Sequence, residues 1–273
     1  MSKQPNSYLL ADQASELERL QLQSRVWEPA GRALLAGLRS ATGLRALEIG
    51  CGVMGWLRLL SESVGPSGIV VGSDVDEKML ARAKQLVEAE RLSNVSLVKD
   101  DLFASQLAPD SFDLLHSRFQ IAPLGRASEQ VAAYLRLLRP GGTIVLEEPD
   151  ISSWRVNPDA PAVQRLIATI EDGFREAGGN FNAGRGLPDL LRSVNIEPRV
   201  SAQVLALEPG HPYLRLPIQF ATALRARLET LMARPELDNL MAQAESEIAR
   251  PGTWGTTFTL IQVSGTRAFE RHA

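Results

Sequence analysis

The chain has 273 residues, of which 22% are charged, and a formal net charge of −3 at pH 7. This length suits one large α/β domain with an insertion better than two independent domains, and a slightly acidic chain lacks the basic surface expected of a nucleic-acid-binding protein. The single cysteine, Cys51, excludes an internal disulfide, and no apolar run approaches the roughly 18 residues that cross a membrane. We therefore expect a cytoplasmic protein without a membrane partner.

The N-terminal region is predicted to be helical. Apolar residues recur at helical spacing from Ala11 to Trp27, and Pro29 is placed to open a second helix. Because these helices precede the first predicted strand, we expect residues 1–40 to cover the edge of a sheet or a ligand site. Tyr8 is predicted to line this cover and to contact substrate, with simple core packing as the alternative.

The stretch from Leu44 to Trp56 organises the next part of the chain. A short apolar run ends in glycines and passes into a helical pattern, which predicts a strand, a tight turn and a helix. Gly50, Gly52 and Gly55 satisfy the pattern Gly-x-Gly-x-x-Gly, and Asp74 follows at the end of the next apolar run. This arrangement is typical of a nucleotide-binding βαβ unit.

Strands and helices then alternate as far as residue 150. The predicted strands are 44–49, 69–73, 95–98, 112–116 and 143–147, and the predicted helices between them include 77–91 and 127–138. Such alternation predicts a doubly wound parallel sheet with helices on both faces. Ligands bind such sheets at the carboxyl ends of the strands where the strand order reverses, so the first and fourth strands should flank a site.

The pattern changes after residue 150. Helices are predicted at 161–174 and 186–193, and two further strands at 200–207 and 256–265. These strands complete a Rossmann-like, seven-stranded, mostly parallel sheet in a domain made of residues 41–207 and 255–273. The intervening residues 208–254 have helical apolar spacing broken by prolines, so we expect a helical insertion, which is either a substrate lid or the arm of a homodimer.

Acidic side chains stand at three successive strand ends, namely Glu48, Asp74 and Asp101. A carboxylate beside the glycine turn would repel the pyrophosphate of a dinucleotide. An amino group, a ribose diol and an adenine amine all donate hydrogen bonds, and carboxylates accept them. The three carboxylates therefore favour S-adenosylmethionine, a sulfonium cation, over NAD.

At these residues the sequence resembles the class I S-adenosylmethionine-dependent methyltransferases, within the group that acts on small molecules. The resemblance extends from Leu44 to Pro149 and is carried by the segments 47–52, 71–74, 99–102, 112–117 and 138–142. One departure is that Val53 and Met54 separate the second and third glycines, which stand closer together in most of the family.

The resemblance implies a set of contacts with the cofactor S-adenosylmethionine. Glu48 would meet the methionine amino group, Asp74 the two ribose hydroxyls, and Asp101 the adenine amine. The remaining implied contacts are Gly50, Cys51, Gly52, Val75, Met79, Leu102 and Ser117. Two alternatives stay open: Asp74 could be an ordinary helix N-cap, and Asp100 could take the role of Asp101.

Candidate catalytic and substrate residues follow the fourth and fifth strands. His116 is the candidate general base, and the alternative is a strand-end histidine that hydrogen-bonds only to the backbone. Asp150 is favoured as the carboxylate facing the pocket, because Glu147 and Glu148 alternate between the faces of the strand. Arg118, Trp154 and Trp254 are candidate substrate contacts, with packing or a surface ion pair as the alternative. The three histidines are too dispersed to predict a metal site.

The predicted activity is transfer of a methyl group to a small-molecule substrate by in-line displacement, in which alignment and desolvation supply most of the catalysis. Oxygen is the favoured acceptor atom, with nitrogen and carbon as alternatives. Two rival hypotheses are a protein that binds the cofactor in a regulatory or other non-methyl-transfer role, and an NAD-dependent oxidoreductase. Glu48 argues against the second rival.

Overall fold

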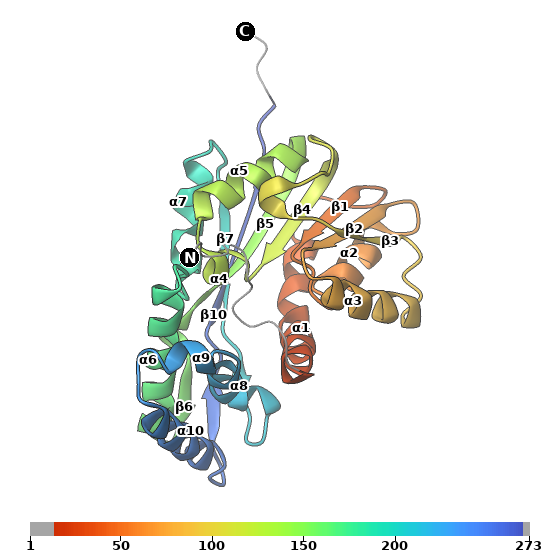
Figure 1. Cartoon of the computed structure of the whole chain (residues 1–273). Helices are drawn as coiled ribbons and strands as arrows, with labels where there is room; N and C mark the ends of the chain where they lie inside the picture. The colour runs from red at the N-terminus through yellow and green to blue at the C-terminus, as the bar shows by residue number, and fades with distance from the viewer. Residues whose placement is uncertain (1–13, 270–273) are drawn as a thin grey trace.

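A computed structural model describes residues 14–269 of the chain. Its centre is a seven-stranded sheet with the order β3-β2-β1-β4-β5-β10-β7 (Figure 1). The strands are β1 (Arg45–Ile49), β2 (Ile69–Asp74), β3 (Val95–Lys99), β4 (Phe112–Arg118), β5 (Leu138–Asp150), β7 (Arg199–Gln203) and β10 (Thr259–Thr266). The first five run parallel, and β10 is antiparallel to both of its neighbours. The predicted seven-stranded, mostly parallel α/β sheet is therefore confirmed.

Both faces of the sheet are covered by helices, because side chains on successive strand residues point to opposite sides. On one face Ala46 and Val70 pack against α2 (Leu57–Val64) and α3 (Glu77–Ala89). On the other face Leu47 and Val71 belong to a core that includes residues of α5 (Ala127–Leu137) and α7 (Leu187–Arg192). These two cores fix β1 in the middle of the sheet, with its carboxyl end free to contribute to a site.

The N-terminal part of the described chain is one helix, α1 (Ala14–Ala36), with Pro29 inside it. The expected break into two helices at Pro29 is wrong. Proline removes one backbone hydrogen bond from a helix and costs about 3 kcal/mol there. Trp27 and Ala30, on either side of Pro29, are both buried, so packing of this helix against the rest of the protein compensates for the lost bond.

A second layer lies below the main sheet in Figure 1. It contains a small sheet of order β6-β9-β8, formed by β6 (Arg155–Asn157), β8 (Ala206–Leu207) and β9 (Trp254–Thr256). The predicted strands 200–207 and 256–265 are each split, because the chain leaves the main sheet near Leu205 and Thr257, whose backbones hydrogen-bond to each other. The helices of this layer are α6 (Pro161–Glu176), α8 (Leu216–Ala223), α9 (Arg225–Leu228) and α10 (Arg234–Ile248).

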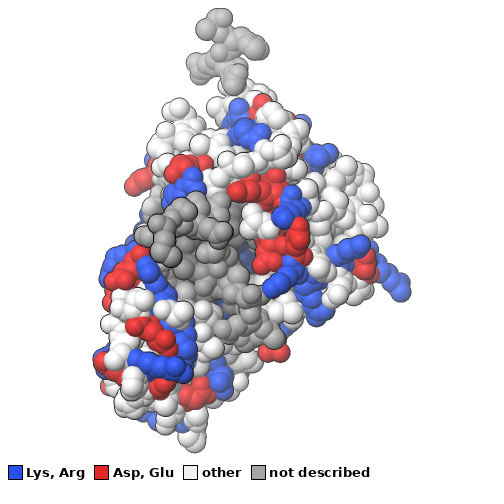
Figure 2. Space-filling view, in the orientation of Figure 1, with Lys and Arg blue, Asp and Glu red and all other residues white. Residues whose placement is uncertain are grey.

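Short elements complete the edge where the parallel strands end. They are α4 (Ile121–Leu124) and the 3₁₀ turns η1 (Leu102–Ala104), η2 (Ile151–Ser153), η3 (Ala183–Gly186) and η4 (Pro212–Arg215). Figure 2 shows acidic and basic side chains interspersed over one face of the molecule. Within residues 14–269, none of the helices has the length and apolar character needed to span a membrane.

Candidate active site

A cavity of about 510 Å³ opens at the carboxyl ends of β1, β2 and β4. This volume lies within the range of about 300–1,000 Å³ that is usual for small-molecule sites. The sheet order reverses between β1 and β4, so the cavity stands at the position expected from the sequence. Helix α1 closes part of it with Leu20, Gln23 and Ser24.

The glycine turn after β1 forms one wall of this cavity. Gly52 has φ of +53°, and a Cβ atom built there would meet nothing within 4 Å, so its backbone is open to close approach by a ligand. Gly55 has φ of +48°, and a Cβ atom there would lie 2.3 Å from Oε1 of Glu48. The turn therefore requires glycine at Gly55 to leave room for that carboxylate.

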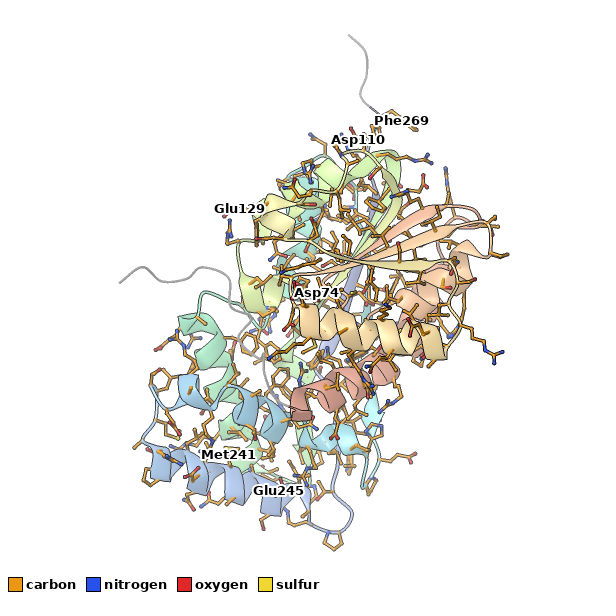
Figure 3. The ribbon with its side chains drawn as sticks, turned by 45° about the vertical axis from the view of Figure 1, so that its right-hand side comes forward. Asp74, Asp110, Glu129, Met241, Glu245 and Phe269 are labelled. Atoms are coloured by element: carbon orange, nitrogen blue, oxygen red, sulfur yellow. The ribbon has the colours of Figure 1, made fainter. Side chains whose placement is uncertain are left out.

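Asp74, at the end of β2, lines the cavity near the start of α3 (Figure 3). Its Oδ2 accepts from the N–H of Gly52 and its Oδ1 from the N–H of Asp76, both at 2.9 Å. Burial raises the pKa of Asp74 despite these hydrogen bonds. The N-cap of α3 is Asp76, so Asp74 is not that helix's cap. Each carboxylate oxygen of Asp74 has a second lone pair for a hydroxyl donor.

Glu48 is tied to two other buried ionisable groups. Its Oε2 lies 2.5 Å from Nδ1 of His116, whose Nε2 lies 3.1 Å from Oε2 of Glu147. The His116 ring stacks on Trp56 with centroids 3.6 Å apart. Burial acts to lower the pKa of His116, but the charge of Glu48 and the hydrogen bonds with Glu147 and Glu48 outweigh it, so the pKa is raised. We call Glu48, His116 and Glu147 the buried triad.

The candidate general base His116 does not face the cavity. Its side chain is 0% exposed, and both ring nitrogens are occupied by the triad carboxylates. Glu48 lines the cavity and His116 lies behind it. The expectation that His116 meets the substrate is therefore corrected: the ring supports Glu48 from inside the protein.

Three other predicted site residues, Ser117, Asp150 and Trp154, also lie away from the cavity. The Ser117 hydroxyl is buried 3.0 Å from the Tyr134 hydroxyl of α5 and does not line the cavity. Asp150 is bound by Arg185, and this hydrogen bond holds the pKa of Asp150 well below its usual range. Trp154 is buried in an aromatic core.

Of the remaining candidate substrate contacts, one is corrected, one is not tested and one lines the cavity. Trp254 is 45% exposed on β9 and does not line the cavity. Tyr8 lies outside the described residues. Of the candidate substrate contacts, Arg118 does line the cavity.

The residues expected around the adenine line the cavity together. They are Val75, Met79, Asp101 and Leu102, and Asp100 lines it as well; Gly50, Cys51 and Gly52 of the glycine turn also line it. Oδ1 of Asp101 also accepts from the N–H of Phe103 at 3.0 Å, which makes Asp101 the cap of η1. The position of both aspartates leaves open which of them would accept from an adenine amine.

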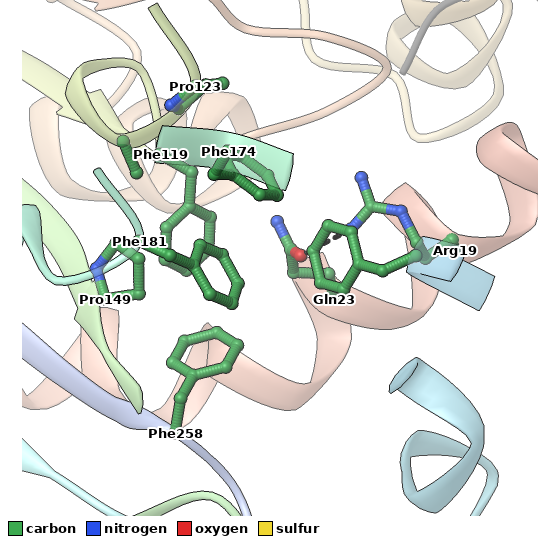
Figure 4. A pocket seen from close by; sticks show the side chains of 10 residues that line it. Arg19, Gln23, Phe119, Pro123, Pro149, Phe174, Phe181 and Phe258 are labelled. Carbon is green, nitrogen blue, oxygen red and sulfur yellow. Dashed lines mark hydrogen bonds between the residues drawn. The ribbon is translucent and has the colours of Figure 1, made fainter. Parts of the chain in front are cut away.

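Two features of the site were missed from the sequence. Glu148 is fully buried, and its carboxylate accepts from the backbone N–H groups of Gln120, Ile121 and Ala122 at 2.7–3.0 Å. Burial raises the pKa of Glu148 to about 7 against the effect of these three donors. The second feature is a smaller cavity beside the first, with five phenylalanines in its wall (Figure 4). No local sequence pattern marks this cavity, because its residues come from six distant segments.

A parallel sheet with reversed strand order, an open glycine turn and acidic strand ends together define a nucleoside-binding α/β protein. Residues 46–142 match the family model of a methyltransferase domain. This match supports a methyltransferase domain of the class I S-adenosylmethionine-dependent type in that part of the chain, as the resemblance implied.

Two relatives by sequence indicate how far this likeness extends. An uncharacterised protein in a transposon of Streptomyces fradiae is 28% identical over 186 residues, which cover 64% of this chain and 53% of that protein. The demethylmenaquinone methyltransferase of Lactococcus lactis is 35% identical over 107 residues, which cover 39% of this chain and 42% of the enzyme. The chain thus spans about half the length of these relatives.

Solved structures show the same fold at low identity. A methyltransferase from Aquifex aeolicus aligns with a TM-score of 0.56 and 16% identity over 94% of this chain and all of its own. The geranyl diphosphate C-methyltransferase of Streptomyces coelicolor aligns with a TM-score of 0.53 and 16% identity over 88% of this chain and 78% of the enzyme.

Proposed function

We propose that this protein transfers the methyl group of S-adenosylmethionine to a small organic acceptor by in-line displacement. The observation that carries the proposal is Asp74, which joins the end of β2 to the glycine turn while facing the cavity. When bound, the cofactor supplies a methyl group on a positively charged sulfur. The protein's part is to hold the reactants in line and to exclude water.

The residues present fit such a cofactor. Gly52 leaves its backbone open, and Asp74 keeps acceptor capacity for a ribose diol. Glu48 lines the cavity, where its carboxylate favours a positively charged ligand, and His116 fixes its position. Asp101 or Asp100 would accept from the adenine amine.

Oxygen remains the favoured acceptor atom, with nitrogen and carbon as alternatives. The carbon alternative is supported by the fold shared with a geranyl diphosphate C-methyltransferase. We further propose that residues 208–254 cover the acceptor, because Phe220 of α8 lines the smaller cavity. A dimer arm is the alternative for this segment.

The proposal is tested by calorimetric titration of the protein with S-adenosylhomocysteine. The variant Asp74→Ala should bind at least about tenfold more weakly, since it loses charged hydrogen bonds that are each worth about 1.5–3 kcal/mol. Asp189→Ala, at a side chain 86% exposed on α7, is the matched control and should bind as the wild type does. Unchanged affinity in Asp74→Ala would remove the ribose assignment.

The rival functions are separated by two further measurements. Incubation with isotopically labelled cofactor and a metabolite extract, followed by mass spectrometry, should reveal a methylated product. Binding of the cofactor without any labelled product across broad extracts would favour the regulatory alternative. A fluorescence titration with NADH should show no binding, whereas saturable binding would favour the oxidoreductase.

A further inference from the structure

The smaller cavity is lined mainly by aromatic rings. Five of the eight phenylalanines of the chain line it: Phe119, Phe174, Phe181, Phe220 and Phe258. Phe174 and Phe181 stack with centroids 4.7 Å apart, and Phe258 meets Phe119 edge-on at 5.6 Å (Figure 4). We call these five residues the phenylalanine cage. Such a surface suits a flat apolar ring, which gains both buried area and favourable ring contacts.

The cage opens toward the larger cavity. Gln23 and Phe119 line both cavities, so the two meet at these residues. The free volume of the cage is about 30 Å³, which places an acceptor ring at this junction instead of deep among the phenylalanines. An acceptor seated there would stand beside the site that we assign to the cofactor.

Phe119 is held at the junction in an unusual conformation. Its φ is +57°, a left-handed value that is rare for a bulky side chain and stores about 1–3 kcal/mol of strain. Its N–H donates to the carbonyl oxygen of Glu147 at 2.9 Å, which holds the end of β4 in this shape. The strained residue turns the chain so that Arg118 lines the larger cavity while Phe119 lines both.

Arg118 carries a buried positive charge at this point. The residue is 8% exposed, and its Nη1 lies 3.7 Å from Oε2 of Glu147, beyond hydrogen-bonding distance. That Nη1 is buried and has no hydrogen-bond partner among residues 14–269, which leaves a donor group unused. Glu147 is meanwhile occupied by His116 and by Gln262, whose Nε2 donates to it at 2.6 Å.

A second guanidinium, that of Arg19, also lines the cage. Nη1 of Arg19 donates to Oε1 of Gln23 at 2.8 Å, and its Cζ lies 4.7 Å from the centre of the Phe220 ring. Burial raises the pKa of nearby Tyr213 to about 12, and the charges of Arg19 and Arg118 act against this rise. Arg19 is the one ionisable side chain in the described wall of the cage, so a base would have to come from the larger cavity, where Glu48 is already bound by His116 and Asp74 by the glycine turn.

We infer that the acceptor is a flat aromatic compound with an acidic hydroxyl group, whose ring enters the mouth of the phenylalanine cage and whose oxyanion pairs with Arg118. This inference rests on the proposed function. A guanidinium within about 4–6 Å lowers the pKa of an acidic group by about 1–3 units, so the acceptor can ionise without a side-chain base. Arg118 is then a substrate-binding residue that also sets the charge of the acceptor.

The reaction balances with these partners. The acceptor hydroxyl first releases its proton to water. Its oxygen then forms a bond to the methyl carbon as the carbon–sulfur bond breaks, and the electron pair of the broken bond stays on sulfur, which becomes a neutral thioether. The negative charge on oxygen and the positive charge on sulfur are both lost, and Arg118 is left facing a neutral ether.

The test uses 4-nitrophenol, whose phenolate absorbs visible light, and nitrobenzene, which has the same ring without the hydroxyl. Each is titrated into the full chain with and without S-adenosylhomocysteine, and the absorbance of bound 4-nitrophenol is followed against pH. The pKa of bound 4-nitrophenol should be lowered by about 1 unit or more relative to the free compound. In Arg118→Met the pKa shift should vanish and 4-nitrophenol should bind about tenfold more weakly, while nitrobenzene binds within about twofold of the wild type.

Further variants distinguish an effect of the positive charge of Arg118 from a general effect on folding. Arg118→Lys should restore most of the pKa shift, and Arg175→Met, at a side chain 67% exposed, should leave both titrations unchanged. If Arg118→Met does not fold, Phe119→Leu still tests the site, since it should weaken both compounds and keep the pKa shift.

Three outcomes would overturn the inference: an equal pKa shift in Arg118→Met, equal affinity of the wild type for both compounds, or no binding of 4-nitrophenol. Loss of S-adenosylhomocysteine binding would instead count against the proposed function, and the titrations without it still report on Arg118.

Discussion

Replacement of His116 by phenylalanine tests the buried triad. The variant His116→Phe keeps a ring to stack on Trp56 but removes both nitrogens that meet Glu48 and Glu147, which are 1% and 0% exposed. Removing one partner from a buried ion pair costs about 3–5 kcal/mol, because the remaining charge has no compensation. An unfolding entropy of about 2.1 cal/mol/K per residue gives about 0.57 kcal/mol/K for this chain, so Tm should fall by about 5–9 °C.

The pH dependence gives a second readout for the same variant. The folded-state pKa of His116 is raised above its ordinary value of 6.5, so its stabilising contribution is fully present below pH 6.5 and is lost as pH rises through the folded-state value. The contribution of His116 to the Tm of the wild type should therefore decrease as the pH rises above 6.5. His116→Phe should lack this contribution.

Differential scanning calorimetry from pH 5 to 9 would measure both effects. His211→Asn is the matched control, because His211 only caps η4 and asparagine can accept the same N–H hydrogen bond; its Tm should stay within about 2 °C. The double variant His116→Phe with Glu147→Gln should recover part of the loss, since the buried Glu147 that has lost its imidazole partner then carries no charge. A Tm change below about 2 °C in His116→Phe, with the wild-type pH slope retained, would refute the triad as a charged unit.

Two further predictions concern the glycine turn. Gly55→Ala should lower the stability of the protein and weaken its binding of S-adenosylhomocysteine by about tenfold, because the new Cβ meets the Glu48 carboxylate at 2.3 Å. The control is Gly252→Ala, at a position with φ of +79° and open space around the new Cβ. Calorimetry should show that this control loses only about 1–2 kcal/mol of stability and binds S-adenosylhomocysteine as the wild type does. Equal effects of the two substitutions would contradict the steric argument. The second prediction concerns Cys51, because burial raises the pKa of its thiol. Ellman's reagent at pH 8 should therefore modify the native protein at least about 100-fold more slowly than the unfolded chain. Rapid modification of the native protein would show instead that the glycine turn opens.

The cofactor side of the site was predictable because it is local. Glu48, Gly52 and Asp74 lie in one βαβ unit, and parallel strands bring their carboxyl ends to one edge whatever the rest of the chain does. The wrong assignment of His116 has a specific cause. The sequence places it at the end of β4, but the direction of its ring is decided by Trp56 and Glu147, which come from other elements.

The acceptor side was not predictable for the opposite reason. The phenylalanine cage joins residues from 119 to 258, and each of them alone resembles an ordinary core position. Asp150 shows the same limit, because its partner Arg185 lies 35 residues away. The uninterrupted helix α1 was not predicted, because the neighbouring sequence shows only the hydrogen bond that Pro29 removes from the helix. The compensating burial of Trp27 depends on tertiary packing, which the local sequence does not show.

The Glu148 carboxylate, which accepts from three consecutive backbone N–H groups, limits how ligands can enter and leave the cavity. A carboxylate on β5 anchors the backbone from Gln120 to Ala122, so this corner cannot swing outward without exposing three unsatisfied N–H groups. On the opposite rim, the Ser24 hydroxyl of α1 donates to the carbonyl oxygen of Gly55 in the glycine turn. Passage in and out of the site should therefore depend on motion elsewhere on its rim, while the backbone from Gln120 to Ala122 stays fixed.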